Sequence, residues 1–167
     1  AACGAAAPCV MSFVSDQLAA LQYIYTTVRP AFANIAAVNM SLGGGPSNAA
    51  ACDGDPLKTG VDTLRSVNIA TVIAAGNDGY ATGISAPACI STAVSVGATD
   101  DGDGIASFSN RAPIMKLFAP GVAIDSSVPP GAFANIGGTS MAAPLVAGAW
   151  ALLKQKNPAW TVAQVLA

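Results

Sequence analysis

The stretch that decides the fold and the chemistry is "GGTSMAAPLVAGAWALL", residues 137–153. Two glycines let the backbone approach another molecule closely, and a helix should then run to about Lys154. Ser140 lies in the first turn of this helix, where free N–H groups and the positive helix end favour a developing negative charge. The stretch predicts a reactive serine, although an ordinary small-residue helix packed against a sheet would also fit it.

The composition limits the classes of protein to which this chain can belong. Of its 167 residues 53% are hydrophobic and only 10% are charged, which fits one domain with a proper core. The net charge of −2, without a basic run, argues against a nucleic-acid partner. The longest apolar run, from Met141 to Leu153, is too short to span a membrane. The first residue is Ala1 rather than methionine, so we expect a processed chain or part of a longer one.

Four cysteines occur at loop-like positions, namely Cys3, Cys9, Cys52 and Cys89. Their spacing matches no zinc motif, and we expect no metal site and no cofactor. The low charge is typical of an exported, compact protein, in which cysteines form disulfides. We therefore predict the pairs Cys52–Cys89 and Cys3–Cys9, with buried free thiols as the alternative.

Strand-like and helix-like segments alternate along the chain. Strands are expected at 35–40, 69–75, 92–96, 105–108 and 116–119, and a Pro/Gly turn is expected at 128–132. Helices are expected after a Ser15 cap and after an Asp55 cap, with Pro56 as the first residue of the second helix. This alternation predicts an α/β fold with a parallel β-sheet and helices on both faces. The strand at 35–40 is apolar on both sides and should lie inside the sheet.

Two glycine loops follow predicted strands and resemble known loops when they are taken together with the serine helix. The segments "VNMSLGGG" (38–45), "VIAAGNDG" (72–79) and "GTSMAAPLVAG" (138–148) occur in this order. The combination closely resembles the subtilisin-like serine proteases, from about residue 35 onward. The resemblance implies a secreted serine endopeptidase domain, of which residues 1–167 are the later, nucleophile-bearing part.

The same resemblance implies a role for each matching residue. Ser140 matches the nucleophile, and Asn77 matches the side-chain donor of the oxyanion hole. Ser41, Leu42 and Gly43 match the segment that pairs with an extended polypeptide substrate, while Ala74 and Gly76 with Gly43 would line an apolar specificity pocket. We note that "GND" is also ordinary turn chemistry.

The chain also departs from the family pattern. It contains no histidine, and no aspartate lies in the strand-then-"DTG" context of the family. The aspartate and histidine motifs would precede this segment, so the general base should lie on a segment that the chain lacks. Lys116 stands where many relatives carry a metal-binding aspartate, and we expect no calcium there. Leu145 replaces a frequent histidine at a position that we take to be structural.

Two other functions fit the same residues. The chain could be a small serine hydrolase or esterase that uses Ser140 without a histidine, or a catalytically dead peptide-binding module. If the chain stands alone, the strand at 35–40 should self-associate or retain a partner segment.

Overall fold

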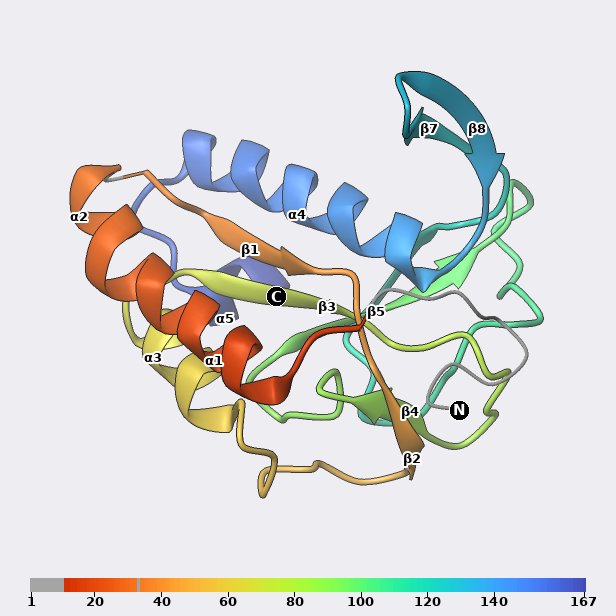
Figure 1. Cartoon of the computed structure of the whole chain (residues 1–167), viewed down its shortest axis with the longest axis horizontal. Coiled ribbons are helices and arrows are strands. Elements are labelled where there is room, and N and C mark those ends of the chain that lie inside the picture. Colours follow the sequence, from red (N-terminus) through yellow and green to blue (C-terminus); the bar gives the residue numbers. More distant parts are fainter. Residues whose placement is uncertain (1–10, 33) are drawn as a thin grey trace.

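The fold is built around a parallel sheet with helices on both sides (Figure 1), and the computed structural model describes residues 11–32 and 34–167. The sheet has the order β1-β3-β5-β6, formed by Ala37–Met40, Ala70–Ala74, Val94–Thr99 and Leu117–Pro120. All five residues of β3 are buried, as expected for a parallel strand that is covered on both faces. The predicted α/β class is confirmed.

The helices divide between the two faces of this sheet. They are α1 (Val14–Tyr23), the π-helical turn η2 (Ile24–Val28), α2 (Arg29–Ala31), α3 (Lys58–Ser66), α4 (Thr139–Lys156) and α5 (Val162–Leu166). Ile73 of β3 belongs to a core cluster with Leu64 of α3, whereas its neighbour Val72 packs in a second cluster with Trp150 of α4. Alternate residues of one strand thus serve two cores. Across residues 11–32 and 34–167, no helix is long and apolar enough to cross a membrane.

Two antiparallel pairs were not expected from the sequence. The strand β2 (Gly44–Asn48) pairs with β4 (Ile84–Ala86), and β7 (Ile124–Val128) pairs with β8 (Ala132–Ile136). The predicted Pro/Gly turn at 128–132 connects the second pair, which projects from the body beyond one end of α4 in Figure 1. These strands have only three to five residues, and β2 contains glycine and proline, so they carry too little periodicity to be recognised in the sequence.

The strand predicted at 105–108 was wrong. Ile105 forms a single bridge with Thr99, and the chain then turns away from the sheet. The backbone oxygen of Phe108 instead accepts a hydrogen bond of 2.8 Å from the N–H of Gly79. The N–H of Ala106 still donates to the backbone oxygen of Ala98 in β5 at 3.0 Å, but the segment forms no continuous ladder and binds the loop that follows β3 at Phe108.

Both predicted helix caps were also wrong. Phe13, not Ser15, is the residue before α1, and no side chain caps that helix. The carboxylate of Asp55 accepts a hydrogen bond of 2.8 Å from the N–H of Leu57, so that a turn precedes α3. The helix then begins at Lys58 rather than at Pro56. Asp55 binds a free N–H as a helix cap does, but this N–H belongs to the turn before α3 and not to the helix.

β1 lies at an edge of the sheet, which corrects the prediction that it would lie inside. Within the described residues its only paired neighbour is β3, with Val38 opposite Thr71. Ala37 and Val38 are half-buried and Asn39 is exposed. The apolar sequence of β1 is that of an interior strand, but no other described strand reaches its second edge.

A disulfide joins Cys52 to Cys89, as predicted, with 5.3 Å between the two Cα atoms. The other predicted pair, Cys3–Cys9, lies outside the described residues. The closed loop connects the segment before α3 to the segment before β5.

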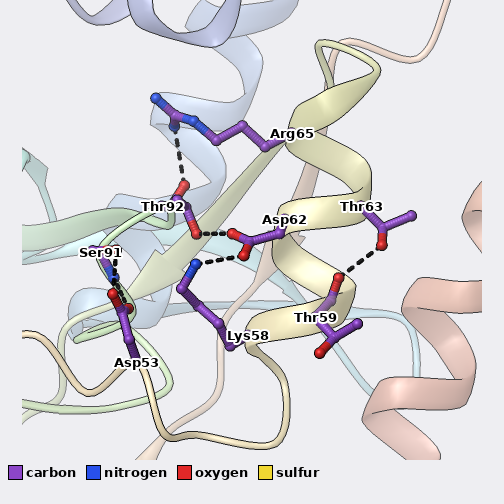
Figure 2. Close-up of polar contacts among 8 residues, drawn as sticks. All are labelled: Asp53, Lys58, Thr59, Asp62, Thr63, Arg65, Ser91 and Thr92. Atoms are coloured by element: carbon purple, nitrogen blue, oxygen red, sulfur yellow. Dashed lines mark hydrogen bonds and ion pairs between the residues drawn. The ribbon is translucent and has the colours of Figure 1, made fainter.

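Polar contacts beside this disulfide fasten α3 to the same segment (Figure 2). Asp53 accepts hydrogen bonds from both the N–H and the hydroxyl of Ser91, at 2.9 and 2.7 Å. Asp62 of α3 accepts hydrogen bonds from Lys58 and from Thr92. The hydrogen bonds from Ser91, that of its N–H first, lower the pKa of Asp53. For Asp62, burial opposes ionisation, but the hydrogen bonds outweigh it and its pKa is also lowered.

The contribution of Asp62 to stability should depend on pH. A carboxylate whose pKa is lower in the folded state stabilises the fold above its unfolded pKa of about 3.9, and this is lost as the pH falls through the folded pKa. We expect Asp62→Asn to lower the free energy of unfolding at pH 7 by about 0.5 kcal/mol, the usual size for a solvent-exposed ion pair. Urea unfolding at pH 7 and pH 2.5 measures this, with Asp101→Asn as the control. An equal loss at both pH values would contradict the prediction.

Candidate functional site

Ser140 lies where the amino end of α4 meets the carboxyl end of β1. The hydroxyl of Ser41 donates a hydrogen bond of 2.8 Å to the backbone oxygen of Ser140, and it accepts one of 3.0 Å from the amide of Asn39. The Oγ atom of Ser140 is 3.5 Å from the backbone oxygen of Ser41. Ser140 is half-buried, and its N–H is among the first of the helix, which have no partner within the helix.

Asn77 lies in the loop after β3 and is oriented by the residue that precedes Ser140. Its Oδ1 atom accepts hydrogen bonds from the N–H and from the hydroxyl of Thr139, at 2.8 and 2.9 Å. The Oδ1 atom is thereby held toward α4, which leaves the Nδ2 group as a donor. A Cβ atom placed on Gly138 would lie 3.4 Å from Nδ2, so the donor lies directly beside the glycines before Ser140. Within residues 11–32 and 34–167, Nδ2 has no protein acceptor.

The segment Ser41–Gly43 connects β1 to β2 and is not itself part of a strand. Ser41 and Gly43 are exposed, while Leu42 is half-buried against the core cluster of α3. The backbone of this segment is therefore accessible beside Ser140.

Gly43, Ala74 and Gly76 converge on β4. A Cβ atom on Gly43 would lie 3.0 Å from the backbone oxygen of Ala86 and 3.7 Å from that of Ala74. Gly76 has φ of +104°, and a Cβ atom there would lie 2.4 Å from the hydroxyl of Ser85. A side chain would be tight at Gly43, and at Gly76 both the positive φ and the missing space require glycine. The structure thus brings together all seven residues that the sequence singled out around Ser140.

A groove of about 320 Å³, lined by apolar and polar residues, adjoins Leu42 and Gly43. Its apolar walls include Met11 before α1, Val14 at the start of α1 and Leu57 from the turn before α3. An extended chain that lies along residues 42–44 could place a side chain in this groove.

Two residues that shape the site were not predicted from the sequence. Thr139 is fully buried, and besides binding Asn77 its hydroxyl accepts a hydrogen bond of 3.2 Å from the N–H of Gly76. Asn110 is also fully buried, and it binds the loop that carries Asn77. The adjacency of Thr139 to Ser140 was a usable signal, whereas the segment around Asn110 has no recognisable motif.

No basic side chain is close to Ser140 by the contacts of the described residues. Lys154 lies on the same helix, but its Nζ donates hydrogen bonds of 2.8 and 2.6 Å to the backbone oxygens of Pro158 and Trp160. Asp78 points toward Asn110 and Ser85, with its Oδ2 accepting hydrogen bonds of 3.0 and 3.3 Å from them. The described part of the chain contains no cluster of three or more His, Cys, Asp or Glu residues that could hold a metal ion.

The chain matches known proteins in sequence and in structure. The sequence model of the Subtilase family matches residues 7–167. The chain is 44% identical to Subtilisin BL of Lederbergia lenta over 127 residues, which are 76% of this chain and 45% of that protein. It is 44% identical to Subtilisin J of Geobacillus stearothermophilus over 135 residues, which are 79% of this chain and 34% of that protein.

A solved structure is similar as well. The crystal structure of a cold adapted subtilisin-like serine proteinase superposes with a TM-score of 0.80 at 32% identity. The superposition covers 93% of this chain and 53% of that one. The chain therefore spans about half, or less, of the length of these relatives.

Proposed function

The chain belongs to the subtilase family, and from this we propose that it is the nucleophile-bearing part of a secreted, subtilisin-like serine endopeptidase domain. The observation that carries the proposal is that Thr139, the residue before Ser140, binds the side chain of Asn77 with two hydrogen bonds. The Oγ atom of Ser140 attacks the carbonyl carbon of a peptide bond while a general base takes the hydroxyl proton. The N–H of Ser140 and the Nδ2 group of Asn77 donate hydrogen bonds to the developing oxyanion. When the tetrahedral intermediate collapses to the acyl ester, the base returns the proton to the leaving amine.

The substrate in this proposal is a polypeptide in extended conformation. It lies along Ser41, Leu42 and Gly43, whose exposed backbone offers groups for main-chain pairing. The side chain before the scissile bond points toward Gly43, Ala74 and Gly76, where the walls are small and apolar. This favours an apolar residue at that position of the substrate.

The general base comes from a polypeptide segment outside this chain. Such a segment can pair with the free edge of β1 and so reach Ser140, which meets the end of that strand. The outer face of α4 supports the same assignment, because Leu145 and Leu152 are 46% and 68% exposed on one helix face. Apolar side chains at this spacing suit a helix packed across them.

Export from the cell is supported by the Cys52–Cys89 disulfide, since such bonds persist in oxidising compartments.

Binding of a peptide boronic acid tests the roles of Ser140 and Asn77 without needing a leaving group. The Oγ atom adds to boron, its proton passes to the buffer, and the boron becomes tetrahedral and anionic. We expect a tetrahedral ¹¹B NMR signal with the chain and none with Ser140→Ala. Asn77→Ala should weaken binding by about 10²-fold, a magnitude borrowed from subtilisin itself. A trigonal boron in the wild-type complex, or binding that is unaffected by either variant, would overturn the proposal.

The edge of β1 that has no strand partner among the described residues leads to a second, separate prediction. We expect the isolated chain either to self-associate through residues 35–40 or to retain a partner segment there, because an unpaired strand edge recruits another strand. Light scattering at several concentrations should give a mass above 16.4 kDa. Hydrogen exchange should show protection at those N–H groups of residues 37–40 that point away from β3. A monodisperse monomer in which these outward N–H groups exchange freely would contradict this.

A further inference from the structure

Asn110 is a fully buried side chain whose hydrogen-bonding groups are all engaged by one loop and its neighbour β4. Its Oδ1 atom accepts hydrogen bonds of 3.0 Å from the N–H groups of both Asp78 and Tyr80. Its Nδ2 group donates at 3.1 Å to the backbone oxygen of Ala75 and to the hydroxyl of Ser85. A third contact of Nδ2, at 3.0 Å, reaches the carboxylate of Asp78.

These contacts span both sides of Asn77. Ala75 precedes Asn77 by two residues, and Asp78 and Tyr80 follow it. The backbone adds a further bond, because the N–H of Asn110 donates to the oxygen of Gly76 at 3.0 Å. One side chain therefore determines the path of the backbone into and out of the residue that we propose as an oxyanion donor.

The close approach of Gly76 is consistent with this assignment. A Cβ atom at Gly76 would lie 2.3 Å from the Nδ2 atom of Asn110, so the loop backbone is pressed directly against the asparagine. Thr139 orients the amide of Asn77 from the other side. Asn110 thus holds the backbone of the loop, and Thr139 holds the side chain of Asn77.

We propose that Asn110 is a positioning residue for the anion-binding site, by which we mean the N–H of Ser140 and the Nδ2 group of Asn77. Asn110 positions this site by fixing the backbone on both sides of Asn77. The inference rests on the proposed function. Asn110 itself touches no substrate atom in this assignment. A displaced loop would move the Nδ2 group of Asn77 away from the oxyanion, while the backbone of Ser41–Gly43 would still bind a planar peptide. Misplacing a catalytic group by about 1 Å can reduce a rate by about 10²-fold.

The test compares two ligands of one sequence, a peptide boronic acid and the corresponding peptide amide. We expect Asn110→Ala to raise the Kd of the boronic acid by about tenfold or more, given the effect of such displacements. The Kd of the planar amide should change by less than about twofold, which is below the value of one ordinary hydrogen bond. Asp62→Asn, which removes polar contacts on α3, is the control and should change neither.

A second variant covers the possibility that Asn110→Ala does not fold. Asp78 is exposed, and Asp78→Ala removes only one acceptor of the Asn110 amide. It should raise the Kd of the boronic acid by about two- to threefold, as the loss of one modest hydrogen bond does. Equal weakening of both ligands, or weakening of neither, would overturn the positioning role.

The outcomes separate this inference from the function beneath it. If the wild-type chain does not form a tetrahedral adduct, the proposed function fails and the inference with it. If the adduct forms and only Asn77→Ala weakens it, the function stands and the role of Asn110 is wrong.

Discussion

Casein incubated with the purified chain is expected to be cleaved no faster than casein incubated with its Ser140→Ala variant. Proton removal from the serine needs a base within about 2.6–3.2 Å of Oγ. The sequence contains no histidine, and the contact recorded for Oγ is the backbone oxygen of Ser41 at 3.5 Å. A peptide carbonyl oxygen is far too weak a base for this step. In subtilisin itself, loss of the catalytic histidine lowers turnover by about 10⁶-fold, and we borrow that magnitude.

Lysine is the remaining side chain that could act as a base. Lys154 is fourteen residues beyond Ser140 on α4, which is about 21 Å at a rise of 1.5 Å per residue. Its Nζ is also occupied by two backbone oxygens. Lys116 is exposed on the segment before β6, and no contact of the described residues brings its side chain to Ser140.

Peptide release by mass spectrometry is the measurement for this prediction. An aryl ester assayed in parallel separates the alternatives, because an activated ester needs less help from a base than an amide does. Slow ester hydrolysis that falls in both Ser140→Ala and Asn77→Ala would identify the anion-binding site as functional without the base. Casein cleavage that disappears in Ser140→Ala would show that an unrecognised base exists and would refute the prediction.

The proximity of the candidate site residues could be predicted, because two of the segments that match the family are glycine-rich loops directly after apolar strands. Carboxyl ends of parallel strands meet at one edge of a sheet, so Ser41 and Asn77 had to lie near one another. The position of Ser140 followed from the helix that its own segment begins. These are local patterns, and local patterns are what a single sequence records well.

The contacts that hold the site were not predictable in the same way. Asn110 lies 33 residues beyond Asn77, two residues after the segment 105–108 that we expected to be a strand. Its role depends on the chain leaving the sheet after Ile105, which is a tertiary choice between two sets of hydrogen bonds. The edge position of β1 was missed for a related reason. An apolar strand sequence indicates that the strand is buried, but it does not say which polypeptide segment lies against it.

The disulfide should contribute the largest single increment of stability. It closes a loop with a sequence separation of 37 residues, and this loop contains α3, β3, Asn77 and β4. Cross-linking a loop of this length removes entropy from the unfolded chain that corresponds to about 4 kcal/mol, an upper figure because unfolded chains retain some structure. We expect the double variant Cys52→Ala/Cys89→Ala to lose about 2–4 kcal/mol in the free energy of unfolding.

Urea unfolding without reductant measures this loss and identifies its origin. If the bond acts through the unfolded state, the variant should expose more surface on unfolding, and its m-value should rise as its midpoint falls. Because alanine is smaller than the buried cysteine that it replaces at position 89, a lower midpoint with an unchanged m-value would point to lost packing instead. Reductant should shift the wild-type midpoint toward that of the variant. An unchanged midpoint in the double variant would contradict the prediction and would mean that the contacts of Asp53 with Ser91 and of Asp62 with Thr92 hold this loop in place without the disulfide.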